Sequence, residues 1–288
     1  MKDQPLLALQ GVDHVFADGS SGLRGCNIAL ARGRRHALLG ANGAGKTTVL
    51  QHLNGLLRPT AGRLLWEGRP VGDGRADLDA LRRRVGLVFQ NPDRQLFAAH
   101  VDEDVSFGPL NLGLDAATVR TRVAAALEAV GMSGHGRHPV HCLSFGQKKR
   151  VCIAGVLAME PQVVLLDEPM AGLDAAMQAE LALLLDRLAA RGVTVLLSTH
   201  DIDFAYAWAD EIHLMAAGGC VAAGAATALA RRDDMLHLAG QRPPLALALH
   251  TQLAARGLLP AGAAPRSVDA VLDALRARPH LQPGETTA

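Results

Sequence analysis

The chain has 288 residues, of which 49% are hydrophobic and 20% are charged, and its formal net charge is +1. These proportions exclude wholesale disorder, and the length suits one large domain with a smaller appendage. The near-zero charge and the aromatic content of 3% provide neither an electrostatic footprint nor stacking platforms for nucleic acid. We therefore expect no nucleic-acid partner.

The cysteines and the apolar runs indicate the cellular compartment of the protein and its relation to membranes. No two of the four cysteines form a Cys-x-x-Cys pair, which favours reduced thiols of a cytosolic protein over a disulfide framework or a zinc site. The first ten residues lack the apolar core of a signal peptide, and no apolar run approaches the roughly 18 residues that span a bilayer. We expect no transmembrane segment, so a membrane role requires a partner.

The first part of the chain has the pattern of short strands around a glycine-rich loop. Alternating apolar residues at 6–16 and a short apolar stretch at 27–31 predict an antiparallel hairpin. Residues 36–39 predict a strand that runs into the glycine-rich loop, and 46–57 have helical periodicity. A further strand and turn are predicted at 64–70.

The middle of the chain changes from strand to helix and back. A continuous apolar strand is predicted at 85–89, and the following residues to 158 are helical, with helices at 115–130 and 146–158. Two apolar runs of the kind buried in parallel sheets then flank a strong helix; the three elements are predicted at 163–166, 175–190 and 193–198.

The last part of the chain begins with a hairpin. Strands are predicted at 211–215 and 220–223 around the Gly218-Gly219 turn. Glycine and proline then separate three predicted helices, at 226–238, 244–256 and 267–277. We expect the tail, residues 280–288, to be disordered.

The strongest chemical motif is the loop Gly40-Ala41-Asn42-Gly43-Ala44-Gly45-Lys46-Thr47, between a predicted strand and a predicted helix. Its glycines let backbone N–H groups surround phosphate oxygens, and the helix N-terminus adds its dipole. Lys46 is expected to reach the β- and γ-phosphates, and Thr47 to place its hydroxyl on Mg²⁺. We predict that this loop binds ATP, through Gly40, Asn42, Gly43, Ala44, Gly45, Lys46, Thr47 and Thr48.

Two adjacent carboxylates, Asp167 and Glu168, end the predicted buried strand at 163–166. The carboxyl end of a parallel strand is where a bound phosphate is met, so both groups can approach it. Asp167 suits the Mg²⁺ shell, and Glu168 suits polarisation of an attacking water. An acidic strand end is often only solvated, but the phosphate loop favours the catalytic interpretation.

The segment Leu143-Ser144-Phe145-Gly146-Gln147, followed by Lys148-Lys149-Arg150, resembles the signature sequence of ATP-binding cassette (ABC) ATPases. The family's other landmarks follow in its order: Gln90 matches the Q-loop glutamine, Asp174 the D-loop, and His200 the switch histidine. The resemblance covers about residues 5–235.

The resemblance implies an α/β fold of the P-loop NTPase class. It combines a RecA-like core sheet with an N-terminal antiparallel β subdomain, a helical subdomain at about 91–160 and a small helical C-terminal extension. We expect the nucleotide-binding domain at 1–235 and the extension at 236–279.

The resemblance also implies the roles of individual residues. Glu168, His200 and Gln90 are the expected catalytic residues, and Gln90 joins Thr47 and Asp167 as a Mg²⁺ ligand. The signature and D-loop residues contact the nucleotide held by a second subunit, so that two subunits form a head-to-tail dimer with composite sites; in this chain they are Ser144, Gly146, Gln147 and Asp174.

Three positions leave alternatives open. Phe16 matches the adenine-stacking aromatic of the family or is an ordinary strand residue beside a turn. Phe145 replaces a glycine and Met170 replaces a threonine, which allows a site that binds ATP without hydrolysing it. The presence of Glu168 and His200 argues against that degenerate site.

Several stretches resemble the energy-coupling-factor branch of importers, namely residues 53–60, 90–97 and 103–113. Within it, residues 146–151, 154–159 and 256–260 resemble the cobalt and nickel uptake ATPases. This implies an ATP-hydrolysing subunit, without a span of its own, at the cytoplasmic face of the cell (inner) membrane. The alternatives are a vitamin importer of the same type and a soluble ABC ATPase.

The implied partners are a second ATPase subunit, in a homodimer or heterodimer, a transmembrane coupling protein and a membrane substrate-capture protein. Leu96, Phe97 and Phe107 either contact coupling helices or pack locally. The C-terminal helices either reinforce a dimer or are a packing appendage.

Three histidines spaced by three residues, His135, His138 and His141, could suggest metal ligands on a helix. Glycines and a proline between them break any helix there. We therefore expect a solvated loop.

Overall fold

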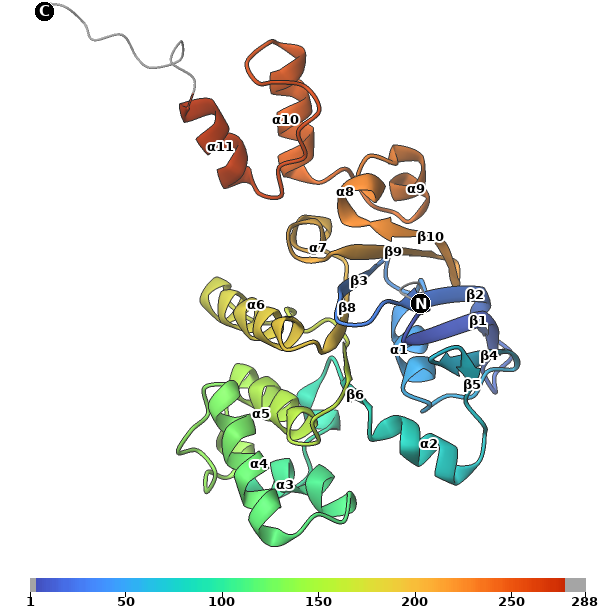
Figure 1. Cartoon of the computed structure of the whole chain (residues 1–288), viewed down its shortest axis with the longest axis vertical. Coiled ribbons are helices and arrows are strands. Elements are labelled where there is room, and N and C mark those ends of the chain that lie inside the picture. Colours follow the sequence, from blue (N-terminus) through green and yellow to red (C-terminus); the bar gives the residue numbers. More distant parts are fainter. Residues whose placement is uncertain (1–3, 278–288) are drawn as a thin grey trace, which may run out of the picture.

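The computed structural model describes residues 4–277 (Figure 1). Its N-terminal part is an antiparallel sheet in the order β2-β1-β4-β5. The predicted hairpin and the strand and turn after the loop are confirmed, although β2 begins earlier than predicted. The strands are β1 (Leu7–Val15), β2 (Ser21–Leu30), β4 (Ala61–Trp66) and β5 (Arg69–Pro70).

The six-stranded core sheet has the order β10-β9-β3-β8-β7-β6. The pairs β9–β3, β3–β8, β8–β7 and β7–β6 are parallel, and β10 returns antiparallel to β9. All were predicted as strands; the apolar runs of β3, β6, β7, β8 and β9 are buried, whereas β10 was predicted from the Gly218-Gly219 turn and is only partly buried. The bounds are β3 (Arg35–Leu39), β6 (Val85–Val88), β7 (Val163–Leu166), β8 (Thr194–Thr199), β9 (Glu211–Ala216) and β10 (Gly219–Ala225).

Helices cover the core sheet on its two faces. α1 (Lys46–Leu53) packs between the two sheets, because Val49 and Leu50 share one buried cluster with residues of β1, β2, β3 and β7. On the other face, α6 (Ala175–Ala190) and α7 (Ile202–Trp208) belong to the second large cluster. α1 is shorter than predicted, since Gly55 takes a left-handed φ of 71° just after its end.

A group of helices stands apart from the sheets after β6 (Figure 1). The two predicted helices are confirmed within about a residue, as α4 and α5. The neighbouring α3, whose interior holds Gly108 and Pro109, lies in the stretch predicted to be helical, although its bounds were not predicted. The bounds are α3 (Val101–Asn111), α4 (Ala116–Ala129) and α5 (Phe145–Leu157), with 3₁₀ turns at Pro92–Arg94 and Val140–Cys142.

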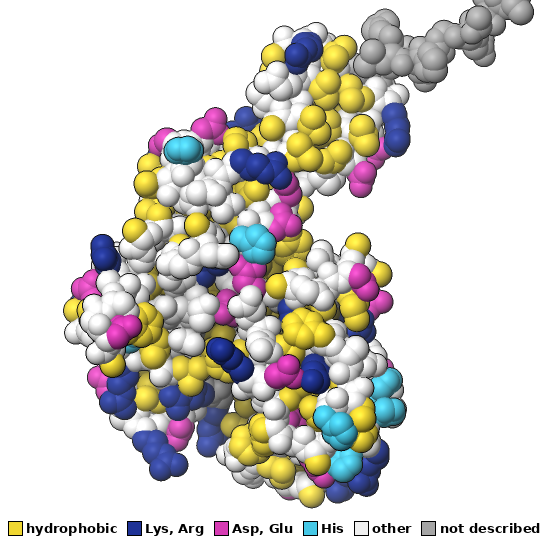
Figure 2. All heavy atoms as spheres, turned by 180° about the vertical axis from the view of Figure 1, so that it is seen from behind, with side chains coloured by type: hydrophobic (Ala, Val, Ile, Leu, Met, Phe, Trp, Pro, Cys, Tyr) yellow, Lys and Arg dark blue, Asp and Glu magenta, His cyan; other side chains and the backbone are white. Residues whose placement is uncertain are grey.

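The C-terminal region contains four short helices, and hydrophobic side chains gather on the surface of α10 and α11 (Figure 2). The single predicted helix at 226–238 is wrong: α8 (Ala226–Leu229) and α9 (Asp233–Leu238) are separated by a turn in which Arg232 has non-helical dihedral angles. α10 (Leu245–Ala255) and α11 (Val268–Arg276) are confirmed and share a small separate core. The tail expected to be disordered lies outside the described residues.

Two other helices were not predicted: α7, and α2 (Arg75–Arg82), a charged surface helix with two buried leucines. Among residues 4–277, no helix is both long and apolar enough to cross a membrane. The parallel strands direct their carboxyl ends to one edge of the core sheet, and that edge holds the candidate site.

Candidate nucleotide site

The glycine-rich loop lies between β3 and α1, as predicted. Gly43 and Gly45 have left-handed φ angles of 81° and 100°, which side chains disfavour. At Gly40 a Cβ atom would lie 2.5 Å from the Met215 carbonyl oxygen, so the close approach of β9 requires glycine there. Ala44 is buried and its carbonyl accepts from the Gly218 amide. The loop is therefore fixed against the neighbouring hairpin.

Lys46 is the first residue of α1 and is almost fully buried. Its Nζ donates to the carbonyls of Gly40 (2.8 Å) and Ala41 (3.3 Å). It also lies 3.6 Å from Glu168 Oε1. The loop thus holds a cation at the helix N-terminus, where a phosphate chain is favoured.

A cavity of about 470 Å³ opens beside this loop. The structure brings together there most of the residues predicted to bind nucleotide within one chain, from the loop, the ends of β6, β7 and β8, and the start of the β1–β2 turn. The lining residues are Phe16, Ser21, Gly22, Asn42, Gly43, Gly45, Lys46, Thr47, Thr48, Gln90, Asp167, Glu168, Ala171 and His200.

Asp167 is buried between two hydroxyl donors. Thr47 Oγ1 donates to Asp167 Oδ2 at 2.7 Å, and Ser198 Oγ donates to Asp167 Oδ1 at 2.6 Å. Neighbouring ligands of an octahedral Mg²⁺ lie about 3 Å apart at the usual bond lengths, and the ion prefers oxygen donors. The Thr47 hydroxyl and Asp167 carboxylate therefore fit Mg²⁺ in spacing and in chemistry.

Glu168 has an unusual backbone conformation for a non-glycine residue, with φ at 45°. Its amide donates to Ser198 Oγ at 2.9 Å, which supports this strained conformation. Its carboxylate Oε2 lies 3.0 Å from His200 Nδ1. The side chain of Glu168 is only 12% exposed, whereas that of His200 is 68% exposed. A carboxylate held between an amine and an imidazole at the cavity wall can orient and polarise water.

Sequence reasoning missed two residues that hold this site. Ser198 bridges Asp167 and the Glu168 amide from the end of β8; its signal was its place two residues before His200. Lys149, on α5, is only 4% exposed, and its Nζ donates to the carbonyls of Pro169 (2.9 Å) and Ala171 (2.5 Å). Burial lowers the pKa of Lys149 to about 8. The feature of the sequence that could have indicated it is a lysine at a position of the predicted helix 146–158 that faces the core.

Phe145, the departure from the family's glycine, points toward the turn after β7. Its ring lies 5.3 Å from Lys149 Nζ, and a Cβ at Gly172 would come within 2.9 Å of it. Met170, the other departure, packs half-buried against the main core. Neither residue lines the cavity.

The predicted signature and D-loop residues lie away from this cavity. Ser144 and Gln147 form a capping box at the start of α5, with Ser144 N–H donating to Gln147 Oε1 at 2.9 Å. Asp174 caps α6 by accepting from Met177 N–H at 2.8 Å. Gly146 allows Met177 to approach α5 closely. Within one chain, these four residues do not contact the loop.

Three aromatic residues differ in their surroundings. Phe16 lines the cavity with its ring partly exposed and edge-on to His14. Phe97 and Phe107 are exposed by 64% and 50% and pack edge to face, with ring centroids 4.7 Å apart. Leu96, in contrast, is partly buried against the main core. Leu96 thus packs locally, whereas the two phenylalanines contact each other and stay exposed to solvent.

The predicted loop around the three spaced histidines is confirmed. His135 and His138 lie in irregular structure with ring centroids 4.8 Å apart, and His141 follows in a 3₁₀ turn. In the described part of the chain, none of these three histidines belongs to a group of three or more side chains that could hold a metal ion.

Comparison with known proteins places these features in a family. Residues 23–171 match the family described as ABC transporter. The chain is 49% identical over 268 residues to the cobalt import ATP-binding protein CbiO of Rhodobacter capsulatus, covering 93% of this chain and 96% of the relative. It is 40% identical over 281 residues to the energy-coupling factor transporter ATP-binding protein EcfA2 of Methanospirillum hungatei, covering 98% of this chain and 70% of the relative.

Solved structures agree. CbiO1 from Clostridium perfringens, described as part of the ABC transporter complex cbiONQ, superposes with a TM-score of 0.73 at 40% identity, covering 82% of this chain and 94% of that one. The dimeric post-hydrolysis structure of the ATP-binding cassette MJ0796, bound to ADP and phosphate, superposes with a TM-score of 0.70 at 26% identity. It covers 76% of this chain and 98% of that one. The chain therefore belongs to the ABC transporter family, as an ATP-hydrolysing subunit of the energy-coupling-factor type.

Proposed function

We propose that this chain powers uptake of cobalt or nickel ions through ATP-driven closing and opening of an ATPase dimer. The observation that carries the choice of substrate is the 49% identity to a cobalt import ATP-binding protein along 93% of the chain. The stretches at 146–151, 154–159 and 256–260 support the same choice.

We assign the chemistry within the chain to a small set of residues. Glu168 polarises the attacking water, and His200 orients the Glu168 carboxylate. Gln90, at the end of β6, reports the state of the γ-phosphate. Lys46 turns from the Gly40 carbonyl toward the β- and γ-phosphates. This assignment is supported by the contacts of Glu168 with Lys46 and His200 at the cavity wall.

Thr47, Asp167 and Gln90 would hold Mg²⁺. When bound, the ion neutralises charge on the phosphate oxygens. Ser198 fixes the orientation of the Asp167 carboxylate toward the Thr47 hydroxyl. Phe16 stacks on adenine at the open side of the cavity, as its partly exposed ring supports.

The nucleotide site is completed by a second ATPase subunit, in a homodimer or a heterodimer. The supporting observation is that Ser144, Gly146, Gln147 and Asp174 lie outside the cavity of their own chain. In a head-to-tail dimer, the N-terminus of α5 would face the partner's γ-phosphate. Hydrolysis removes that contact, and the dimer opens.

The output of this cycle reaches a transmembrane coupling protein, with a separate membrane protein capturing the ion. The chain then sits peripherally at the cytoplasmic face of the cell membrane. The exposed pair Phe97 and Phe107, which follows Gln90 in the chain, supports a contact there.

We further propose a division at residue 235, with the nucleotide-binding domain at 1–235 and a helical extension at 236–279. The separate small core of Ala246, Leu259 and Val271 supports this division.

Reconstitution with the membrane subunits in vesicles tests the proposal. We expect ATP-dependent uptake of Co²⁺ or Ni²⁺ that Glu168→Gln abolishes. Uptake of a vitamin instead would favour the related importer class. ATPase activity stimulated by DNA or ribosomes, and not by the membrane subunits, would contradict a role in transport.

A further inference from the structure

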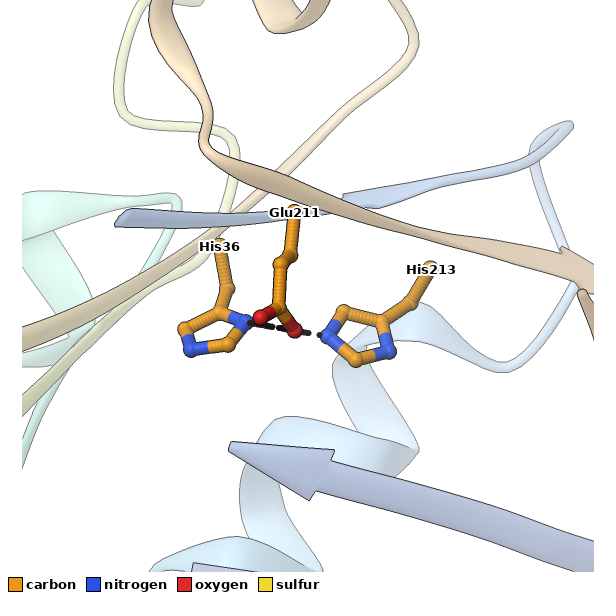
Figure 3. Close-up of side chains that lie close together, drawn as sticks. All are labelled: His36, Glu211 and His213. Carbon is orange, nitrogen blue, oxygen red and sulfur yellow. Dashed lines mark hydrogen bonds and ion pairs between the residues drawn. The ribbon is translucent and has the colours of Figure 1, made fainter. Parts of the chain in front are cut away.

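A second cluster of histidine and glutamate lies on the core sheet, away from the nucleotide cavity (Figure 3). β3 and β9 are parallel neighbours, with His36 opposite Glu211 and Leu38 opposite His213. Because side chains alternate along a strand, His36, Glu211 and His213 share one face. Figure 3 shows the three side chains pointing toward one another. The register of two strands thus builds a cluster from residues 177 apart in the chain.

The separations among these side chains match those of ligands around one ion. His36 Nδ1 lies 3.2 Å from His213 Nε2 and 3.6 Å from Glu211 Oε2. All three candidate ligand atoms lie within 4.8 Å of one another. Tetrahedral ligands at bond lengths of about 2.0–2.1 Å stand roughly 3.4 Å apart. A small rotation of the glutamate is enough to close the set.

The hydrogen bond of His36 Nε2, on the far side of the ring from the cluster, fixes the tautomer that a metal ligand needs. His36 Nε2 lies 3.2 Å from the Ala31 carbonyl oxygen, which only accepts, so Nε2 carries the proton. The lone pair of Nδ1 therefore faces the cluster. Histidine ligands of metals are commonly oriented by such a bond to a backbone carbonyl.

His213 can become a ligand by exchanging its tautomer. In the metal-free cluster its Nε2 donates to His36 Nδ1, and its buried Nδ1 has no hydrogen-bond partner among residues 4–277. Moving the proton to Nδ1 breaks only the bond between the histidines, which two metal bonds would replace.

Glu211 supplies the negative charge of the cluster and is the residue through which solvent reaches it. Its side chain is 34% exposed, whereas His36 is fully buried. Its ion pair within the described residues is with His36 at 3.6 Å, so a change of its side-chain torsions would keep the carboxylate within the cluster. Three protein ligands would leave a fourth position for water.

We propose that His36, Glu211 and His213 form a site for one first-row divalent transition metal ion of the cobalt, nickel or zinc class. Two imidazoles and one carboxylate suit these ions, whereas Mg²⁺ prefers oxygen ligands alone. The site is distinct from the Mg²⁺ position at Thr47 and Asp167, and it does not depend on the ion that is transported.

The site is tested by titrating the full chain, purified without a polyhistidine tag and free of nucleotide, with CoCl₂ in excess Mg²⁺. We expect one equivalent of Co²⁺ to bind with visible d–d absorption, and Zn²⁺ to displace it. Glu211→Gln should weaken binding by at least the roughly 10- to 100-fold seen on removing outer-shell partners. The control His138→Gln, which changes an exposed loop histidine, should bind as the wild type does.

Thermal unfolding separates loss of the site from loss of the fold. A bound metal raises the unfolding midpoint of the wild type. Glu211→Gln should retain the metal-free midpoint and lose most of the Co²⁺-dependent rise. The proposal is overturned if the wild type binds no Co²⁺ in excess Mg²⁺. It is also overturned if Glu211→Gln keeps the wild-type affinity and spectrum, or if His138→Gln is the variant that loses binding.

Discussion

The carboxyl edge of the core sheet and the face of β3 and β9 each bring a histidine against a glutamate, with opposite consequences. At the carboxyl edge, His200 is exposed and Glu168 sits on a strained backbone at the wall of an open cavity. On the β3–β9 face, His36 and His213 are buried at a register position. Strand ends leave polar groups free to change partners, whereas paired strands fix them. The first arrangement suits turnover, and the second suits a stable site.

The largest expected effect is at the carboxyl edge. Glu168→Gln keeps the shape of the side chain but removes the base, so the rate of ATP hydrolysis should fall by about 10²–10⁴-fold. Nucleotide binding, measured with a fluorescent analogue, should remain. Glu128→Gln, on the exposed side of α4, is the matched control and should retain turnover. Equal, slow hydrolysis by the wild type and Glu168→Gln would show that the site is degenerate.

Lys46→Ala should weaken the binding of nucleotide itself. Loss of charge-assisted hydrogen bonds worth about 1.5–3 kcal/mol corresponds to roughly 10- to 100-fold in Kd. Isothermal titration with ATP and Mg²⁺ measures it, with Lys148→Ala, a more exposed lysine paired with Asp93, as the control. An unchanged Kd would remove Lys46 from the phosphate site.

Ser198→Ala tests whether strand β8 supports both carboxylate residues. The change leaves the Glu168 amide without its acceptor and removes one of the two hydroxyl donors of Asp167. We expect the free energy of unfolding in urea to fall by about 1–3 kcal/mol, with slower hydrolysis. Ser106→Ala, at a half-buried position of α3 away from the nucleotide cavity, should change neither. A loss of hydrolysis without a loss of stability would mean that Ser198 acts on the nucleotide directly.

The smallest expected effect is a pH dependence from Lys149. Its pKa is about 8 in the folded chain, against 10.5 as the ordinary value, so the unfolded chain binds more protons between these pH values. The free energy of unfolding should therefore rise with pH from about 8 to 10.5. Lys149→Met removes this group, and urea unfolding at several pH values should lose that part of the rise. An identical pH profile would assign the rise to other groups.

Much of the fold was predictable because strongly apolar runs and turn glycines act locally. The parallel strands and α4, α5 and α6 follow directly from such runs. The bounds of α3 were not predictable within the stretch expected to be helical: Gly108 disfavours a helix locally but is needed because a Cβ there would lie 2.7 Å from Met159 Cγ on the neighbouring segment. The break between α8 and α9 depends likewise on packing, since their residues suit a continuous helix.

The phosphate loop and the Asp167-Glu168 pair could be recognised from the sequence alone, because the residues that each of them requires are adjacent in the chain. The roles of these residues stay predictions until the variants are measured. The support of Glu168 by Ser198 and Lys149, and the contact of His36 with His213, become visible only in the folded chain. These contacts join segments far apart in the chain, and they depend on strand order and register, which local patterns do not encode.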